Sequence, residues 1–215
     1  MKVCTTVFGY AGGQKIIDRH LPLWKQVSDE VMLVFPEDSP NSGKGAHLFP
    51  TGRSNKYGEE CLKRQLAGMR RSLDFDADFY VFLEYDAFML ARPVEREGVQ
   101  ANVFPNRDPR FLGPGYFHFP WIFDAKSLKQ FAAQATLDPF EMGFVDRWLQ
   151  GQLARMNLPV HNLRRLREGF SRNTLRTRFQ RRFAVELARK GGYAFHGVKD
   201  RALLRRIHKA YHERR

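Results

Sequence analysis

The sequence predicts an α/β fold in which a mixed sheet is flanked by helices, with a basic helical part near the C-terminal end. Three observations indicate this fold. Apolar, strand-like segments alternate with amphipathic, helix-like segments in the first half of the chain, an order typical of a sheet with helices on its faces. One of the strands ends in two carboxylates. The excess positive charge is confined to the last quarter of the chain.

The length and composition are those of a folded globule. The 215 residues suffice for one domain with a substantial core, which we expect over residues 1–160, with residues 161–215 as a basic helical segment of the same domain. A hydrophobic content of 43% excludes a disordered chain. No apolar run approaches a membrane span, the N-terminal residues lack a signal-peptide pattern, and two cysteines make no disulfide framework. We therefore expect a reduced, cytoplasmic protein.

The first half of the chain contains the alternating elements. Residues 2–8 form the first strand, and a helix follows over about residues 14–27, interrupted near Pro22. Residues 30–35 form the second strand, and residues 41–57, rich in glycine, serine and basic residues, form a loop. The next helix is amphipathic and buries Leu62, Leu66, Met69 and Leu73.

The third strand carries the feature that points to function. Residues 79–83 are an unbroken apolar run, typical of a strand buried on both faces, and Glu84 and Asp86 follow directly. Burying a carboxylate is costly unless a cation or hydrogen-bond donors compensate. Mg²⁺ and Mn²⁺ prefer oxygen ligands and commonly join carboxylates to phosphates. The pattern indicates a metal site for a phosphorylated ligand at the carboxyl end of the strand. Acidic turn residues without a metal are the alternative.

The second half of the chain continues the pattern. Residues 99–104 form a strand, and residues 111–123 form a turn among aromatic residues, whose glycines allow close approach to a ligand. Asp124 or Ser127 caps a short helix. A longer helix begins near Glu141.

Two acidic residues lie in the first turns of that longer helix. Glu141 and Asp146 either stabilise the helix dipole or act as a general base. The sequence alone leaves both interpretations open.

The last quarter of the chain is strongly basic. Residues 161–215 contain 17 basic and 4 acidic residues, a net charge of +13, whereas residues 1–160 contain 19 of each. Arginine, the better phosphate ligand, outnumbers lysine. This asymmetry indicates nucleic acid or an anionic membrane surface as a partner, with a solvated tail as the third possibility. One helix here is expected to bury Leu175, Phe179, Phe183 and Leu187 and to leave the arginines outside.

The C-terminal end combines a strand-like segment, a loop and a helix. Residues 191–200 are strand-like and then loop-like, and His196 and Lys199 lie where the strand ends, a setting that suits a metal or phosphate ligand. The last helix is expected to bury Leu203, Leu204, Ile207 and Tyr211.

The order of these motifs over about residues 1–200 resembles the GT-A glycosyltransferases, which use nucleotide-diphosphate sugars. Glu84-Tyr85-Asp86 matches the D-x-D element of that family except at its first position. The resemblance implies that Asp86 binds the metal directly and that Glu84 acts through water or the ribose of the donor. It also implies that His196 binds the metal and that Lys199 lies near the diphosphate.

The resemblance implies further roles. In inverting members the acceptor base would fall on Asp146, with Glu141 as the alternative, and the loop 113–116, including Gly115, would lie under the donor sugar. Arg53 or Lys56 would add positive charge near the phosphates. The residues expected near the nucleotide are Thr6, Phe8, Tyr10 and Asp38.

The implied activity is that of a GT-A-like, metal-dependent glycosyltransferase. It would use Mn²⁺ or Mg²⁺ and move a hexose from a UDP-sugar, with UDP-glucose as the first candidate; retention or inversion stays open. The basic segment favours a hydroxymethylated pyrimidine in DNA as the acceptor, as in phage DNA modification, which places a viral enzyme in the host cytoplasm. The alternatives are a peripheral bacterial enzyme acting on a lipid-linked or lipopolysaccharide glycan, a non-catalytic nucleic-acid-binding protein, and a nucleotidyltransferase.

Overall fold

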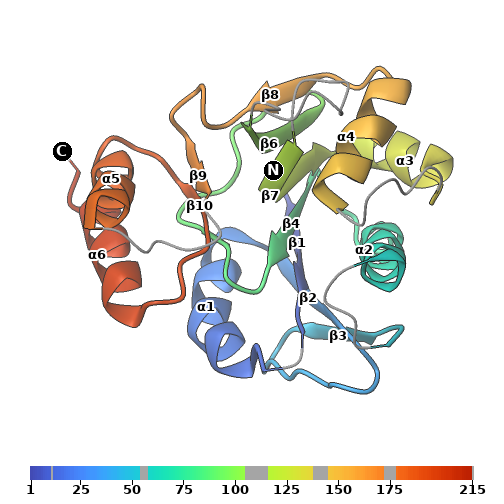
Figure 1. Cartoon of the computed structure of the whole chain (residues 1–215), viewed down its shortest axis with the longest axis horizontal. Helices are drawn as coiled ribbons and strands as arrows, with labels where there is room; N and C mark the ends of the chain where they lie inside the picture. Colours follow the sequence, from blue (N-terminus) through green and yellow to red (C-terminus); the bar gives the residue numbers. More distant parts are fainter. Residues whose placement is uncertain (11, 54–57, 105–115, 138–144, 172–177, 215) are drawn as a thin grey trace.

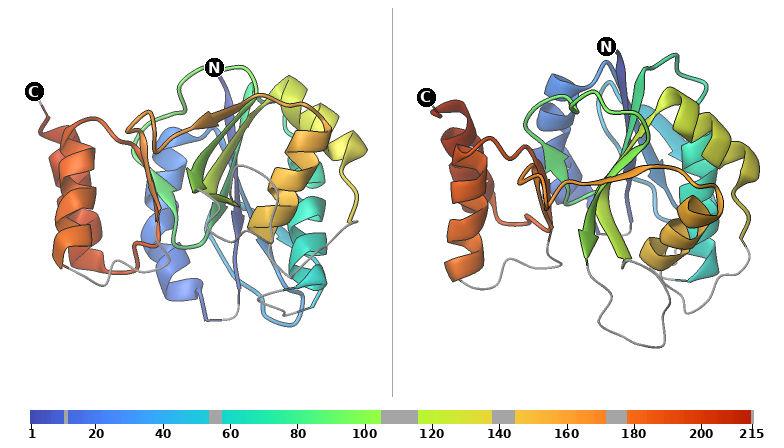
Figure 2. Two further views of the ribbon diagram at one scale, coloured as in Figure 1. Left: turned by 45° about the horizontal axis from the view of Figure 1, so that its top comes forward. Right: turned by 90° about the horizontal axis from the view of Figure 1, so that it is seen from above.

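The computed structural model of the chain describes residues 1–10, 12–53, 58–104, 116–137, 145–171 and 178–214. A central sheet has helix α1 (Gln14–Val27) on one face and helices α2, α3 and α4 on the other (Figure 1). A small second sheet and a pair of C-terminal helices lie beyond α1 (Figure 2). No helix within the described ranges has the length and hydropathy to cross a bilayer.

The central sheet is mixed, as the sequence predicts. Its seven strands lie in the order β3-β2-β1-β4-β7-β6-β8. The first four in this order run parallel, and β7 is antiparallel to both of its neighbours. The strands are β1 (Val3–Phe8), β2 (Glu30–Phe35), β3 (His47–Pro50), β4 (Phe79–Glu84), β6 (Val99–Phe104), β7 (Tyr116–Asp124) and β8 (Val160–Asn162).

Three helices cover one face of this sheet, and two more form the C-terminal pair. In α3 the cap is Asp124, whose side chain accepts a hydrogen bond from the backbone N–H of Ser127 at 2.8 Å. The helices are α2 (Glu59–Ser72), α3 (Ala125–Gln134), α4 (Val145–Arg155), α5 (Arg178–Arg189) and α6 (Arg201–His212).

Three expectations for local structure were wrong. Pro22 does not interrupt α1, because Ile17 and Trp24 on either side of it are both fully buried and their packing outweighs the lost hydrogen bond. Strand β3 lies within the predicted loop, since it pairs with β2 and is mostly exposed, without an apolar pattern. Residues 116–124 are a strand between β4 and β6, not a turn; residues 111–115 lie outside the described ranges.

The second sheet brings the C-terminal part of the chain to the end of β4. It contains β5 (Phe88–Met89), β10 (Ala194–His196) and β9 (Gly169–Ser171), in that order. In the antiparallel pair, Phe195 lies opposite Phe88, and their rings stack at 5.4 Å. His196 is therefore held beside the turn that links β4 to β5.

The C-terminal helices pack differently from the prediction. In α6 the expected apolar residues are buried, but in α5 Phe179 is 78% exposed and Phe183 is 50% exposed. Leu187 is buried as expected, while Leu175 lies outside the described ranges. The prediction was wrong because α5 packs on α6 through a different face, which carries Ala184, Val185, Leu187 and Ala188, while the half-exposed Phe183 contacts Phe170 of β9 with ring centres 5.6 Å apart.

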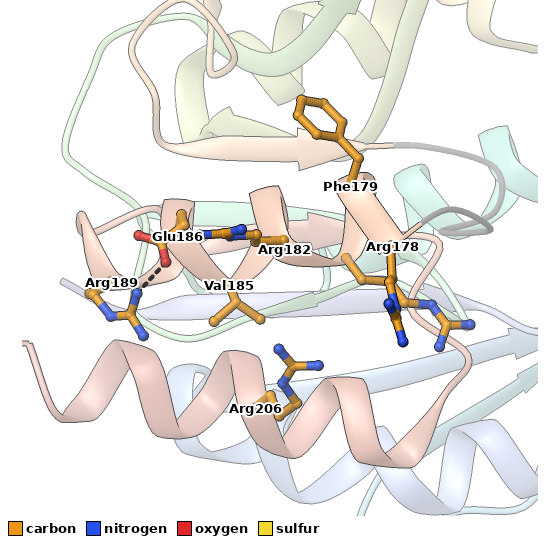
Figure 3. A pocket seen from close by; sticks show the side chains of 8 residues that line it. Arg178, Phe179, Arg182, Val185, Glu186, Arg189 and Arg206 are labelled. Carbon is orange, nitrogen blue, oxygen red and sulfur yellow. Dashed lines mark hydrogen bonds and ion pairs between the residues drawn. The ribbon is translucent and has the colours of Figure 1, made fainter.

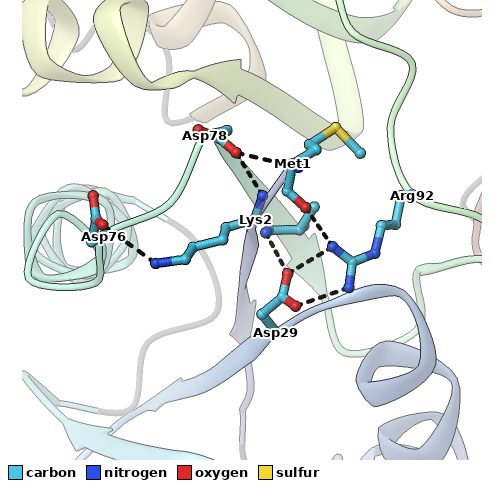
Figure 4. A network of polar contacts seen from close by, with 7 residues as sticks. Met1, Lys2, Asp29, Asp76, Asp78 and Arg92 are labelled. Atoms are coloured by element: carbon cyan, nitrogen blue, oxygen red, sulfur yellow. Dashed lines mark hydrogen bonds and ion pairs between the residues drawn. The ribbon is translucent and has the colours of Figure 1, made fainter.

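At the amino edge of the sheet, a polar network joins β1, β2 and β4 (Figure 4). Asp29 accepts a hydrogen bond from the backbone of Val3 at 2.8 Å and two from Arg92 at 2.8 and 2.9 Å. Asp78 accepts one from the backbone N–H of Lys2 at 2.6 Å. This network fixes the edge opposite the one where Glu84 lies.

Candidate metal centre

The three predicted metal ligands come together at one point. Glu84 is the last residue of β4, Asp86 follows in the next turn, and His196 is the last residue of β10. One potential ligand atom from each of these residues lies within 4.8 Å of the others. Residues 112 positions apart in the sequence thus meet because β10 pairs with β5.

The cluster is compact and mostly buried. The Nε2 atom of His196 lies 2.9 Å from Oε2 of Glu84 and 3.4 Å from Oδ1 of Asp86. Lys199 places Nζ 3.3 Å from the other oxygen of Asp86. The side chains of Asp86 and His196 are 4% and 6% exposed, whereas those of Glu84 and Lys199 are 40% and 44% exposed. Solvent therefore reaches the cluster from the side of Glu84 and Lys199.

Backbone contacts hold the turn and the loop that carry these groups. The backbone N–H of Val198 donates to the carbonyl of Asp86 at 3.2 Å. Trp24 of α1, whose ring is fully buried, donates its indole N–H to the carbonyl of Ala87 at 2.9 Å. Arg19, also of α1, donates to the carbonyl of Lys199 at 2.7 Å. Helix α1 thus fixes both segments of the site.

The electrostatics show that charge pairing outweighs burial here. Burial alone would raise the pKa of Asp86, but the positive charges of His196 and Lys199 hold it below its usual value. Burial alone would lower the pKa of His196, yet Asp86 and Glu84 raise it to about 10. The site therefore holds the imidazolium of His196 against the ionised Asp86, with the carboxyl group of Glu84 also beside its Nε2 atom.

This donor set fits a divalent cation. Two carboxylates and an imidazole are ligands that Mn²⁺ and related ions accept, and a bound ion would take the place of the imidazolium proton. Oδ1 of Asp86 is buried and faces Nε2 of His196 at 3.4 Å, so a cation that replaced the imidazolium proton would meet this oxygen as well.

Some residues expected near the nucleotide lie beside this cluster. The hydroxyl of Tyr85 donates to that of Tyr10 at 2.9 Å, and their rings meet edge to face at 4.4 Å. Nζ of Lys199 lies 5.5 Å from the centre of the Tyr85 ring. Tyr10, Tyr85 and Lys199 thus pack side by side next to Asp86, and of the three Tyr85 is buried while Tyr10 and Lys199 are partly exposed.

Two other nucleotide candidates belong to the core. Thr6 is fully buried in β1, and Phe8 is buried at its end, with its ring stacked on Phe82 at 6.2 Å. Phe8 of β1 lies opposite Glu84 of β4 in the parallel pair, so its backbone helps to position Glu84. The direct nucleotide contacts expected of Thr6 and Phe8 stay predictions.

The remaining candidates are more distant from the cluster or outside the described ranges. Asp38 and Arg53 are exposed and follow β2 and β3, whose carboxyl ends lie at the same edge of the sheet as that of β4. Asp146 belongs to α4, but its side chain lies outside the described part of the structure. The predicted residues outside the described ranges are Lys56, Gly115 and Glu141.

His118 is a residue near the site that sequence reasoning missed. It lies in β7, and its ring centre is 5.6 Å from that of His196. Burial and the positive charges of His196 and Arg164 lower the pKa of His118 to about 3, so its ring is neutral. A single histidine in an aromatic strand gives no sequence signal, because its neighbour in space comes from a distant strand.

Comparisons with known proteins identify no family for this chain. No protein-family model matches the sequence, and no curated protein does. Among solved structures, 2-C-methyl-D-erythritol 4-phosphate cytidylyltransferase from Thermus thermophilus is 18% identical with a TM-score of 0.49, covering 75% of this chain and 88% of that one. A mutant Drosophila β-1,4-galactosyltransferase 7 in complex with manganese, UDP-Gal and xylobiose is 10% identical with a TM-score of 0.47, covering 75% of this chain and 65% of that one. Similarity at this level carries no argument about function.

Proposed function

We propose that this chain is a metal-dependent glycosyltransferase that moves a hexose from a UDP-sugar to an acceptor hydroxyl. The observation that carries the proposal is the cluster of Glu84, Asp86 and His196 at the carboxyl end of β4. The sequence motifs in which these residues occur resemble those of GT-A glycosyltransferases, and open α/β sheets bind ligands at this edge.

Each group in the cluster has a role in such a transfer. Asp86 and His196 would hold a divalent cation, with Glu84 toward the open side, and the cation would neutralise charge on the leaving diphosphate. Lys199 is half-exposed and lies next to Asp86, so its ammonium adds positive charge where phosphate oxygens would lie. Tyr10, which is partly exposed and packs on the buried Tyr85, offers a ring for the nucleotide.

In the transfer, the acceptor oxygen bonds to the anomeric carbon while the bond from that carbon to the UDP oxygen breaks. The acceptor proton must go to a base. If the configuration is inverted, Asp146 or Glu141 is the candidate base. A retaining enzyme does not require that base.

For the acceptor, we infer a hydroxymethylated pyrimidine in DNA, modified in a reducing cytoplasm. The basic residues of α5 and α6 support this assignment because they supply phosphate-binding groups in the same part of the chain as His196 and Lys199. Neither Cys4 nor Cys61 forms a disulfide and both are buried, which accords with a reducing compartment.

The proposal predicts that the protein releases UDP from UDP-glucose in the presence of Mn²⁺ and that a chelator stops this release. In Asp86→Ala the rate of UDP release should fall at least about 100-fold, because a direct metal ligand is lost. The assay measures UDP by chromatography, with hydroxymethylated DNA as acceptor and mass spectrometry of the digested nucleosides. Other UDP-sugars are tested in parallel.

The matched control is Asp76→Ala, since Asp76 is almost fully exposed at the opposite edge of the sheet. It should retain full turnover. The proposal fails if Asp86→Ala is as active as the wild type, or if no UDP-sugar is turned over with Mn²⁺. Release of pyrophosphate from a nucleoside triphosphate would instead indicate a nucleotidyltransferase.

A further inference from the structure

Five of the eight residues that line a groove between α5 and α6 are arginines. It has a volume of about 610 Å³, and its walls come from both helices (Figure 3). Arg206 reaches from α6 toward the α5 side of the groove in the same view. The lining residues are Arg178, Phe179, Arg181, Arg182, Val185, Glu186, Arg189 and Arg206.

The charge of this groove is not balanced within it. Its lining holds five arginines and one glutamate; Glu186 pairs with Arg189, and Arg181 pairs with Asp200 at 3.7 Å, so the excess charge is carried by Arg178, Arg182 and Arg206. Arg178 and Arg182 are four residues apart on the same helix face, a spacing at which like charges repel. Arg178, Arg182 and Arg206 are exposed on neighbouring helices, so they form a patch of positive charge that would attract an anionic ligand.

The packing of the two helices argues against a membrane as the ligand. An interfacial helix needs an apolar face free to enter the lipid. In α5 that face is covered within the protein, and α6 likewise buries its own apolar side chains. Phe179 and Phe183 are the only large hydrophobic residues exposed on the described part of the two helices. Two phenylalanines do not make an insertion face.

The aromatic residue at the groove points to the kind of anion. Phe179 is one of the lining residues and is 78% exposed, and its ring projects from α5 away from α6 and Arg206, so it lies at the rim of the groove (Figure 3). Exposed aromatic rings next to cationic groups bind single-stranded nucleic acid, because the bases stack on the rings while the phosphates contact the cations. We propose that this groove binds single-stranded nucleic acid, with the backbone along the arginines and an unpaired base on Phe179.

The groove is connected to the metal centre. Arg181 lies 3.7 Å from Asp200, which caps α6 through the backbone of Leu203 at 2.8 Å. Asp200 directly follows Lys199, whose ammonium contacts Asp86. A strand in the groove therefore has one end close to the loop of the candidate active site. Only the idea that the bound strand is the acceptor rests on the proposed function. The binding of a strand in the groove is inferred independently of that function.

The test measures binding without any donor. A fluorescein-labelled oligothymidylate of about 16 nucleotides is titrated with protein at several salt concentrations, and anisotropy is recorded. The double variant Arg178→Gln/Arg182→Gln should bind roughly tenfold more weakly at low salt, and its log–log salt slope should be smaller by about 1.4, since two phosphate contacts are lost. Phe179→Ala should weaken binding roughly fivefold or more with an unchanged slope.

The matched control is Lys126→Gln/Lys129→Gln, which removes the same charge from the exposed face of α3, on the other side of the sheet. It should bind like the wild type. Equal losses in both double variants would mean that only net charge matters and would overturn the proposal, as would no binding by the wild type. Circular dichroism confirms that each variant is folded.

Two further readouts separate the alternatives. If phosphatidylserine vesicles bind in an Arg178- and Arg182-dependent manner while the oligonucleotide does not, the groove is a membrane site and the proposal is wrong. If the wild type binds the oligonucleotide but turns over no UDP-sugar, the proposed glycosyltransferase function is wrong and the proposed nucleic-acid site in the groove is supported. If the wild type turns over a UDP-sugar but does not bind the oligonucleotide, only the proposed nucleic-acid site in the groove is wrong.

Discussion

Asp86 is almost completely buried where β4 ends, and a buried carboxylate without partners would cost several kcal/mol of stability. Its pKa lies below the usual value, so the attraction of His196 and Lys199 outweighs that cost. The same carboxylate, with Glu84, keeps His196 protonated far above the usual range. The cluster is thus already arranged around a positive charge before any metal binds.

A second charged residue, Asp29, holds the opposite edge of the sheet together. Arg92 donates two hydrogen bonds to its carboxylate, and both side chains are partly exposed. We predict that Arg92→Gln lowers the free energy of unfolding by about 1 kcal/mol at pH 7, because a two-point charge-assisted pair at a surface is worth that much. Thermal unfolding of the wild type and variant measures the difference.

The effect of Arg92→Gln should depend on pH. The hydrogen bonds and charge of Arg92 lower the pKa of Asp29 from 3.8, so the stabilisation is present above pH 3.8 and is lost as the pH falls through the lower, folded-state value. The difference in melting temperature should shrink in acid. A difference that grows below pH 3.8 would contradict the assignment. Lys126→Gln, which removes a highly exposed pair with Glu97, should have almost no effect at either pH.

The sequence named the charged groups that meet in the candidate metal centre but not their surroundings. Glu84 and Asp86 are neighbours in the chain, and His196 and Lys199 share a short motif, so chemistry and order suffice to name them. Contacts such as those of Arg19 with the carbonyl of Lys199 depend on how α1 packs. No local pattern records that packing.

At the scale of elements, helix α2 approaches the sheet closely because it has no side chain at Gly68. An added Cβ there would lie 2.9 Å from the ring of Phe8 and 2.9 Å from a methyl group of Val34. We predict that Gly68→Ala lowers stability by about 1–3 kcal/mol, since overpacking outweighs the gain in helix propensity of about 1 kcal/mol. Urea unfolding measures the change.

Gly151 in α4 provides the control for this prediction. An added Cβ there meets nothing within 4 Å, so only helix propensity remains. Gly151→Ala should raise stability by about 0.5–1 kcal/mol. If both alanine variants were stabilised alike, the close approach of α2 to β1 and β2 would be wrong.

The elements with strong internal patterns were predicted, and those that depend on partners were not. The buried run of β4 and the apolar spacing of α2 define those elements locally. Strand β3 has no such pattern, because it pairs only with β2 at the edge. In α5 the spacing of Phe179 and Phe183 suggested a buried face, but helix α6 packs on another one.

At the scale of the whole molecule, the amino ends and the carboxyl ends of the parallel strands in the central sheet carry different groups. The amino edge is closed by the network around Asp29 and Arg92 (Figure 4). The carboxyl edge carries the cluster of Glu84, Asp86 and His196, and the cationic groove of α5 and α6 is joined to it through Asp200. This arrangement places a candidate catalytic centre beside a candidate polyanion site.

The most direct test of this arrangement is anomalous diffraction from crystals soaked with Mn²⁺ and UDP. A single manganese peak should lie within bonding distance of Asp86 and His196, with phosphate oxygens of UDP on its open side, and it should be absent in Asp86→Ala crystals. A cluster without manganese at saturating concentrations, or a peak that persists at the same place in Asp86→Ala, would contradict the assignment of the metal centre.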